Sequence, residues 1–270
     1  MAYKMLVLDI DGTLTNSQKK ITPRTFEALR NLQKRDEIIV LASGRPTAGI
    51  LPIAEQLELA QYGGYILSYN GAKVINCTTN DIIYQKTLPK DVIPAIYEDA
   101  VKYQLGILTY KNNSVISGTK IDEYIEKEAK INQIDIVVTE SFPEYVTFDV
   151  NKCLMTGGPD HLAKVELILQ KKYPHLSIYR SEPYFLEIMP MNIDKAYSLG
   201  KLLEHLNLTK EEMICMGDGF NDRSMIKYAG LGVAMSNAQE VVKKEADYIT
   251  FSNDKDGVAH VIEKFITKTA

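Results

Sequence analysis

Several features that mark other protein classes are scarce or absent in this sequence of 270 residues. Its three cysteines, Cys77, Cys153 and Cys215, show no Cys-x-x-Cys spacing, which indicates neither a disulfide framework nor a zinc site. Cys215 lies in the apolar run Met-Ile-Cys-Met-Gly and is expected to be a small core residue. No apolar stretch approaches the roughly 20 residues of a membrane span, and the chain begins with a strand pattern rather than a signal peptide. We expect a soluble cytoplasmic protein with no membrane partner.

Basic residues are not in excess either. Lys and Arg total 31 against 35 Asp and Glu, which gives a formal net charge of -4. Nucleic-acid-binding domains usually carry a basic excess, so the composition favours no nucleic-acid partner. The net charge of the chain does not give the charge of an individual pocket. The composition is therefore compatible with an enzyme that binds anions in a local site.

Strands and helices alternate in the first part of the chain. Residues 5–9 and 38–42 read as short buried strands, and helices are predicted over 23–36 and 47–59. Parallel strands that are buried on both faces form unbroken apolar runs, as these two do. The alternation therefore predicts a parallel sheet that is covered by helices on both faces.

The middle of the chain has a different character. From about 82 to 190 the strands become shorter and more polar, and they alternate with helical stretches such as 91–103 and 159–172. The last third returns to the first pattern. We predict an α/β protein with a doubly wound parallel-sheet core, formed by 1–81 and 191–270, and an α/β subdomain inserted at 82–190.

Polar residues follow three of the predicted core strands. Asp9 ends the first strand, and Ser43 with Gly44 follows the second. Asp218 and Asp222 follow the strand Met-Ile-Cys-Met-Gly. Open parallel sheets bind ligands outside the carboxyl ends of their strands, so we expect these groups to meet at one edge.

Asp9 and Asp11 lie two residues apart where the first strand ends. This spacing in an extended chain projects both carboxylates to the same side, where they repel each other unless something compensates. A divalent cation would compensate, with Asp218 and Asp222 as further ligands, and Mg²⁺ takes such oxygen ligands together with substrate phosphates. The alternative is a plain turn, since Asp-Gly is a common turn dipeptide. A calcium loop does not fit, because the sixth position counted from Asp9 is Leu14 rather than Gly.

Three further positions have both a structural and a functional interpretation. Ser43 either caps the next helix or presents its hydroxyl, with the Gly44 N–H, to an anion. Lys195 is either a solvated surface charge or a cation that reaches the strand ends from its position just before a helix. Lys201 lies inside that helix and is less well placed to reach the strand ends. Asn221 either caps a helix or belongs to the same site.

Together these segments resemble the haloacid dehalogenase superfamily of phosphotransferases. Asp-Ile-Asp-Gly-Thr at 9–13 looks like its first motif, and Ser43 in Leu-Ala-Ser-Gly-Arg matches the second. Lys195 matches the third motif and Gly-Asp-Gly-Phe-Asn-Asp at 217–222 the fourth. The tail 229–262 is similar to the Cof-type branch of sugar-phosphatase-like hydrolases. Each motif alone is a weak signal, whereas four in order with this tail are specific.

The resemblance implies that 82–190 is a large α/β cap domain on a Rossmann-like catalytic core. One mild departure is Ala196, where relatives often have glycine, and it is expected to affect packing more than chemistry. Substrate choice is expected to come from cap loops near 111–117 and 180–185. The sequence does not predict an oligomeric state.

The resemblance also implies a mechanism. Asp9 would attack phosphorus to form an aspartyl-phosphate. Asp11 would protonate the leaving group and then take a proton from water, and we expect the like charge of Asp9 to help raise the pKa of Asp11. Lys195 completes the catalytic set. The implied phosphate ligands are Ser43, Gly44, Lys195 and Asn221. The implied Mg²⁺ ligands are Asp9, the Asp11 carbonyl and Asp218, with Asp222 either ligating the ion or steadying it.

The function expected from these features is a magnesium-dependent phosphatase of small phosphorylated metabolites, in particular sugar phosphates. Asp11 favours hydrolysis or mutase chemistry, since ATPase relatives carry threonine at that position. A phosphomutase would use the same residues, and a catalytically silent regulatory binding protein would not need Asp11. A nicotinamide-dependent oxidoreductase is disfavoured because no Gly-x-Gly-x-x-Gly follows the first strand.

Overall fold

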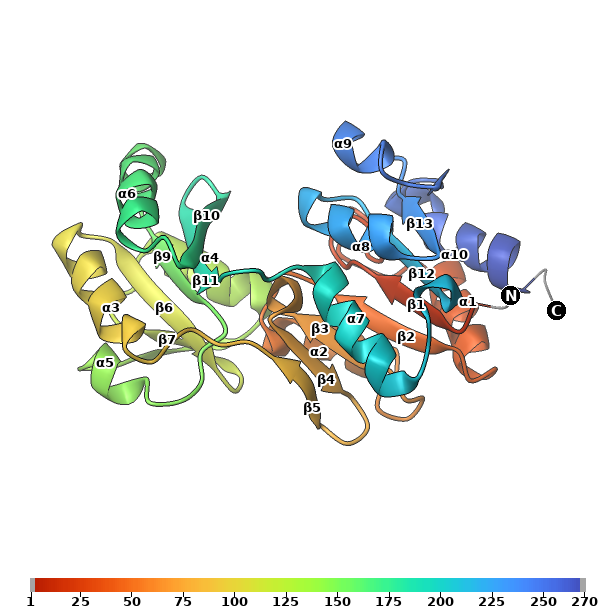
Figure 1. Ribbon diagram of the computed structural model, residues 1–270, viewed down its shortest axis with the longest axis horizontal. Coiled ribbons are helices and arrows are strands. Elements are labelled where there is room, and N and C mark those ends of the chain that lie inside the picture. Colours follow the sequence, from red (N-terminus) through yellow and green to blue (C-terminus); the bar gives the residue numbers. More distant parts are fainter. Residues whose placement is uncertain (1–2, 268–270) are drawn as a thin grey trace. The chain divides into compact units, whose positions relative to one another are not determined.

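The computed structural model describes residues 3–267, and in it the chain forms two compact units (Figure 1). The core unit comprises Met1–Tyr84 and Asp194–Ala270, and the insertion unit comprises Gln85–Ile193. The predicted insertion at 82–190 overlaps the second of these units, and its role as a cap domain stays a prediction.

The core unit is built on an eight-stranded sheet, ordered β14-β13-β12-β1-β2-β3-β4-β5. Neighbouring strands from β14 to β3 are parallel, and β4 pairs with β3 in the antiparallel sense. The strands are β1 (Met5–Leu8), β2 (Ile38–Ala42), β3 (Tyr65–Ser68), β4 (Lys73–Asn76), β5 (Ile82–Gln85), β12 (Met213–Gly217), β13 (Leu231–Ala234) and β14 (Tyr248–Ile249). The predicted doubly wound, Rossmann-like α/β core is confirmed.

The central strand β1 shows why the sheet is covered on both faces. Leu6 and Leu8 belong to an apolar cluster that includes Leu29 of helix α1 (Pro23–Gln33). Val7, which points to the other face, belongs to a second cluster with Leu199 of helix α7 (Lys195–Leu206). Successive strand residues alternate between faces, so an apolar strand needs a helix layer on each side.

The remaining core helices lie along the same sheet. They are α2 (Thr47–Gln56), α8 (Arg223–Tyr228), α9 (Glu240–Lys243) and α10 (Gly257–Val261). Helix α1 begins as the sequence predicts, with Pro23 in its first turn and the Thr22 side chain accepting a hydrogen bond from the Thr25 N–H. Cys215 is fully buried in β12 and is a core residue, as expected.

The insertion unit has its own six-stranded sheet, ordered β10-β11-β9-β6-β7-β8. Its strands are β6 (Gly106–Lys111), β7 (Ser114–Ser117), β8 (Asp135–Val138), β9 (Cys153–Thr156), β10 (Leu176–Glu182) and β11 (Phe185–Pro190), and its helices are α3 (Val92–Lys102), α4 (Glu123–Asn132), α5 (Phe142–Tyr145) and α6 (Pro159–Lys172). A separate apolar cluster that includes Ile107, Phe142 and Leu162 fills its interior. This unit therefore has the hydrophobic core that an independent domain requires.

A buried ion pair lies within the insertion sheet. The Lys152 ammonium is 3.2 Å from a Glu187 carboxylate oxygen, and both side chains are less than a tenth exposed. Tyr179 also donates a hydrogen bond to Glu187, at 3.1 Å. These contacts give the Glu187 carboxylate two partners inside the unit.

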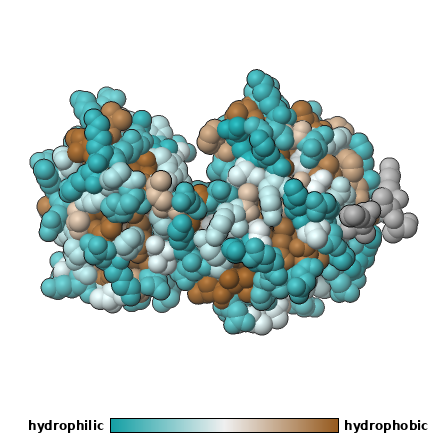
Figure 2. All heavy atoms as spheres, in the orientation of Figure 1, coloured by the Kyte–Doolittle hydropathy of each residue, from teal (hydrophilic) through white to brown (hydrophobic). Residues whose placement is uncertain are grey.

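The surface in view in Figure 2 is largely hydrophilic, with apolar residues mixed in. Some apolar exposure is ordinary for a folded protein. Over residues 3–267, none of the helices has the length and apolar character needed to cross a bilayer.

Candidate active site

The turn after β1 brings the first motif against the fourth. Asp9 is buried, and its N–H still bonds to the Met216 carbonyl of β12 at 3.0 Å. Gly12 adopts φ +86°, and a Cβ there would lie 2.4 Å from an Asp218 carboxylate oxygen. Only glycine permits this approach. The Thr13 hydroxyl then donates to Asp218 at 2.8 Å, so the turn is fixed directly on that carboxylate.

Carboxylates from two strand ends gather in one group. Within residues 3–267, oxygens of Asp9, Asp218 and Asp222 lie within 4.8 Å of one another. Asp222 is fully buried, and its Oδ2 accepts hydrogen bonds from the N–H groups of Asp218 and Gly219 at 2.9 and 2.8 Å. The Asp11 carboxylate lies outside this group, so the expectation from spacing that one cation would compensate both the Asp9 and the Asp11 carboxylates is wrong. The resemblance implied only the main-chain carbonyl of Asp11 as a ligand. The predicted convergence at one sheet edge is present for these three residues.

Lys195 contacts two carboxylates of this group. It is the first residue of α7, its side chain is fully buried, and its ammonium donates three hydrogen bonds. The acceptors are Asp9 Oδ1 at 2.8 Å, Asp222 Oδ1 at 2.5 Å and the Ala42 carbonyl at 2.8 Å. The solvated-charge alternative for Lys195 is therefore wrong. Lys201 instead forms an ion pair with a glutamate of its own helix.

The group contains more acid than base. Burial, followed by the charge of Asp222, raises the pKa of Asp9 to about 8, and burial raises the pKa of Asp218 to about 6. Burial alone would lower the pKa of Lys195, but Asp222 and Asp9 outweigh it and raise that pKa. One ammonium does not balance three carboxylates, so a divalent cation would relieve their repulsion. Hard oxygen donors in this number fit Mg²⁺.

The second motif continues into a loop after β2, in which Ser43 is buried and Gly44 and Arg45 are half-buried. Ser43 Oγ accepts a hydrogen bond from the Arg45 N–H at 3.2 Å. The N-cap position of α2 belongs to Pro46, so the helix-capping alternative for Ser43 is wrong. Gly44 lies against Asn70, whose Oδ1 would be 3.0 Å from a Cβ at position 44.

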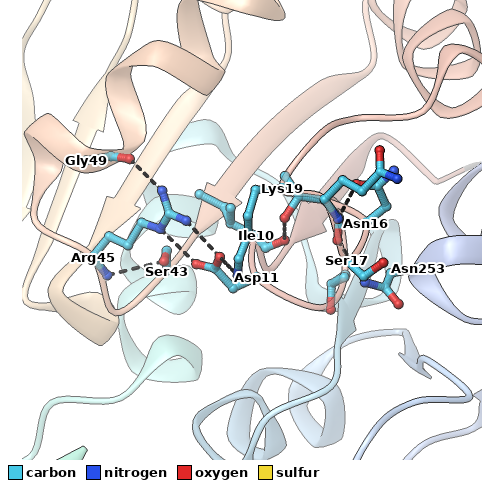
Figure 3. Close-up of polar contacts among 12 residues, drawn as sticks. Ile10, Asp11, Asn16, Ser17, Lys19, Ser43, Arg45, Gly49 and Asn253 are labelled. Atoms are coloured by element: carbon cyan, nitrogen blue, oxygen red, sulfur yellow. Dashed lines mark hydrogen bonds and ion pairs between the residues drawn. The ribbon is translucent and has the colours of Figure 1, made fainter. Parts of the chain in front are cut away.

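Two cations hold the Asp11 carboxylate (Figure 3). Arg45 donates from Nε and Nη2 at 2.8 and 2.7 Å, and Lys19 donates from Nζ at 2.8 Å. Burial alone would raise the pKa of Asp11, but the hydrogen bonds and charges of Arg45 and Lys19 outweigh it and lower that pKa. The expectation that Asp9 would help raise it is wrong, because the two cations dominate the surroundings of Asp11. The second motif contains Arg45, but the sequence did not indicate that the Arg45 side chain contacts Asp11.

Asn221 contacts a strand end that the sequence motifs did not indicate. Its Nδ2 donates to Asn70 Oδ1 at 2.9 Å, and Asn70 lies directly after β3. The dipeptide Asn70-Gly71 is a turn signal that was available in the sequence. A turn signal does not say what the turn touches, so the residue was missed.

The chain matches one protein family over nearly its whole length. A family model described as haloacid dehalogenase-like hydrolase matches residues 6–262. The chain belongs to this family. A haloacid dehalogenase-like hydrolase from Bacteroides thetaiotaomicron has a solved structure with a TM-score of 0.94 and 49% identity, over 97% of this chain and 99% of that one. A putative phosphatase from Haemophilus influenzae is 32% identical over 98% of both chains. A solved haloacid dehalogenase subclass IIB sugar phosphatase is 26% identical with a TM-score of 0.81, over 97% of this chain and 98% of that one.

These matches confirm two predictions. The chain is a Cof-type member of the haloacid dehalogenase-like hydrolases, and it is an enzyme of the phosphatase class. Hydrolases of this family generally use a divalent metal ion, typically Mg²⁺.

Proposed function

We propose that this phosphatase hydrolyses phosphate monoesters of small metabolites, in particular sugar phosphates, with Mg²⁺ as its metal ion. The observation that carries the proposal is the buried contact of Lys195 with both Asp9 and Asp222, beside Asp218. Similarity to a sugar phosphatase supports the substrate class.

The metal ligands in this proposal are Asp9, the Asp11 carbonyl, Asp218 and Asp222. When bound, the ion neutralises phosphoryl oxygens and favours the ionised form of the surrounding carboxylates. Ser43, the Gly44 N–H, Lys195 and Asn221 hold the phosphoryl group. Catalysis of phosphoryl transfer depends mainly on such positioning and charge neutralisation.

Asp9 is the proposed nucleophile. A carboxylate oxygen forms a bond to phosphorus while the bond from phosphorus to the leaving oxygen breaks, which gives an aspartyl-phosphate and an alkoxide. Lys195 holds Asp9 Oδ1 at 2.8 Å, which limits the orientations that this carboxylate can take. Water then attacks the aspartyl-phosphate and regenerates Asp9 with release of inorganic phosphate.

Asp11 is the proposed acid and base. It gives its proton to the leaving alkoxide and takes one from the attacking water. Arg45 and Lys19 both favour its ionised form. Protonation of Asp11 for transfer to the leaving group is therefore disfavoured while both contacts are in place.

The test begins with the wild-type protein and p-nitrophenyl phosphate. We expect steady release of phosphate with Mg²⁺ and its loss in EDTA. A panel of phosphorylated metabolites, compared by kcat/KM, then identifies the preferred substrate. A phosphomutase would instead convert one phosphorylated isomer into another with little free phosphate, and a silent binding protein would show no turnover.

The variant Asp9→Asn tests the covalent mechanism. The amide is a poor nucleophile, so we expect turnover to fall by roughly a thousandfold or more. Asp81→Asn makes the same change at an exposed turn and serves as the matched control, with wild-type turnover expected. Wild-type activity in Asp9→Asn would contradict nucleophilic attack by this residue.

A further inference from the structure

The loop that follows β3 has an unusual backbone. We call residues 69–71 the Asn70 loop. Tyr69 and Asn70 have φ values of +53° and +54°, and Gly71 has +105°. Positive φ is ordinary for glycine and tolerated by asparagine, but it is a genuine outlier for a bulky tyrosine. A backbone of this kind persists only where the surroundings hold it in place.

The Asn70 loop is bonded to the second motif through the backbone. The Tyr69 N–H donates to the Arg45 carbonyl and the Asn70 N–H to the Ser43 carbonyl, both at 3.0 Å. These two bonds tie the position of residues 43–45 to the left-handed conformation of the Asn70 loop.

The Asn70 loop also packs on the first turn of the helix that carries Lys195. The Ser198 hydroxyl of α7 donates to the Gly71 carbonyl at 2.5 Å. A Cβ at Gly71 would lie 2.6 Å from the carbonyl oxygen of Asp194, the residue before Lys195. The glycine is needed for this close approach.

The Asn70 side chain connects the second motif to the fourth. Its Oδ1 accepts a hydrogen bond from Asn221 Nδ2 at 2.9 Å and would lie 3.0 Å from a Cβ at Gly44. A carboxamide nitrogen carries two donor hydrogens. Because Asn70 accepts one of them, it fixes the orientation of the Asn221 amide and leaves the second hydrogen for another acceptor.

We propose that Asn70 is a positioning residue for phosphate: it aligns the Asn221 amide and the Gly44 backbone on the phosphoryl oxygens. The inference deepens the proposed phosphatase function and rests on it. The competing explanation is purely conformational, since asparagine is a common choice for a left-handed turn.

The variant Asn70→Gly separates the two explanations, because glycine keeps positive φ without strain and removes the side chain with its carboxamide. The measurements are kcat and KM for p-nitrophenyl phosphate with Mg²⁺, the inhibition constant of inorganic phosphate and the melting temperature. We expect kcat/KM to fall roughly tenfold to a hundredfold, phosphate inhibition to weaken, and the melting temperature to stay close to that of the wild type. Wild-type values of kcat/KM and phosphate inhibition would overturn the proposal.

A matched control is available at Asn80. This residue is exposed, lies between β4 and β5, and also has positive φ, at +62°. Asn80→Gly makes the same exchange of residue type at the same kind of backbone, far from the motifs in sequence. We expect wild-type kinetics from it, and a loss equal to that of Asn70→Gly would overturn the proposal.

A double-mutant cycle with Asn221→Ala tests whether Asn70 acts through Asn221. Residues that work through one contact give non-additive effects. Asn70→Gly should therefore lower kcat/KM by a smaller factor in the Asn221→Ala background than in the wild type, and equal factors would overturn the coupling.

If Asn70→Gly does not fold, Asn70→Asp replaces it, since aspartate tolerates the same backbone. Its added charge should weaken inhibition by inorganic phosphate, and unchanged inhibition would overturn the proposal.

Failure of this inference is distinct from failure of the proposed function. A wild-type protein without phosphatase activity in Mg²⁺ would overturn both. An active wild type with an unaffected Asn70→Gly variant would overturn only the role of Asn70.

Discussion

Asp9 lies where a carboxylate is difficult to keep ionised. Burial and the negative charge of Asp222 raise its pKa to about 8, although Lys195 opposes them. The proposed nucleophilic attack needs the ionised form, which a further positive charge beside Asp9 would favour at neutral pH. Metal ions bind deprotonated ligands, and their binding is coupled to proton release. The excess of negative charge from Asp222 and Asp218, which contributes to the raised pKa of Asp9, therefore favours a metal ion beside it.

Gly12 provides a test of this carboxylate group at the scale of one residue. In Gly12→Ala the new Cβ would lie 2.4 Å from the Asp218 carboxylate, which must move. We expect the Mg²⁺ concentration for half-maximal activity to rise roughly tenfold or more, because metal affinity falls by such a factor when the contacts that orient a ligand are lost. A titration of activity against Mg²⁺ measures this.

Gly63→Ala is the control for backbone strain. Gly63 has φ +71°, yet a Cβ there would meet no described atom within 4 Å. Both variants introduce a left-handed alanine, so both should lose some stability. Only Gly12→Ala should change the Mg²⁺ requirement, and an equal change in Gly63→Ala would contradict the role given to Asp218.

At the scale of elements, the insertion sheet depends on its buried ion pair. Lys152→Met would leave the Glu187 carboxylate, which is 7% exposed, without its cation. An uncompensated buried charge costs about 3–5 kcal/mol. We therefore expect a lower urea midpoint for unfolding. The double variant Lys152→Met/Glu187→Met should recover much of the loss, because two apolar side chains remove the charge altogether; a double variant less stable than the single one would contradict this account.

The turn after the first motif is joined to the segment before α10 by a pH-sensitive contact. The N–H and hydroxyl of Ser17 donate to Asp254 at 2.8 and 2.9 Å, and these hydrogen bonds lower the pKa of Asp254. A lowered pKa in the folded state stabilises the protein above the ordinary pKa of aspartate, and this contribution is lost as the pH falls through the lowered value.

Asp254→Ala should therefore melt at a lower temperature than the wild type at neutral pH. The difference in melting temperature should shrink as the pH falls below about 4. Thermal unfolding followed by circular dichroism across this range measures it. A difference that does not change with pH would show that the charge of Asp254 is not responsible.

At the scale of the whole molecule, the two units have separate apolar cores. The core-unit clusters contain Leu8 and Val7, whereas the insertion-unit cluster contains Phe142. The proposed metal ligands all belong to the core unit. A ligand stabilises only the folded unit that binds it, by about 2.7 kcal/mol at a hundred times its dissociation constant.

Calorimetry with Mg²⁺ and with EDTA should therefore show a shift in one part of the unfolding profile. We expect Mg²⁺ to raise the melting temperature of the core unit and to leave that of the insertion unit unchanged. Asp218→Asn should remove the shift. An equal shift of both transitions, or a shift that persists in Asp218→Asn, would contradict a single metal site built by the core unit.

The sequence by itself determined the sheet and the residues that follow its strands. Unbroken apolar runs such as 38–42 are typical of strands inside a parallel sheet with helices on both faces, and β2 has those bounds. The carboxyl ends of parallel strands share one edge, so Asp9 and Asp218 could be placed together from local pattern alone. Both inferences depend only on short segments of sequence and on a sheet topology to which there are few alternatives.

Tertiary structure alone decided the electrostatic surroundings of those residues. Asp11 has a lowered pKa because Arg45 reaches it from 34 positions away, and Asn70 meets Asn221 across 151 positions. Pattern and spacing describe which way a strand or helix faces, but they do not describe which side chains two distant loops bring into contact. The gathering of polar groups at one sheet edge was therefore predictable, whereas their charge state and their supporting contacts required the folded chain.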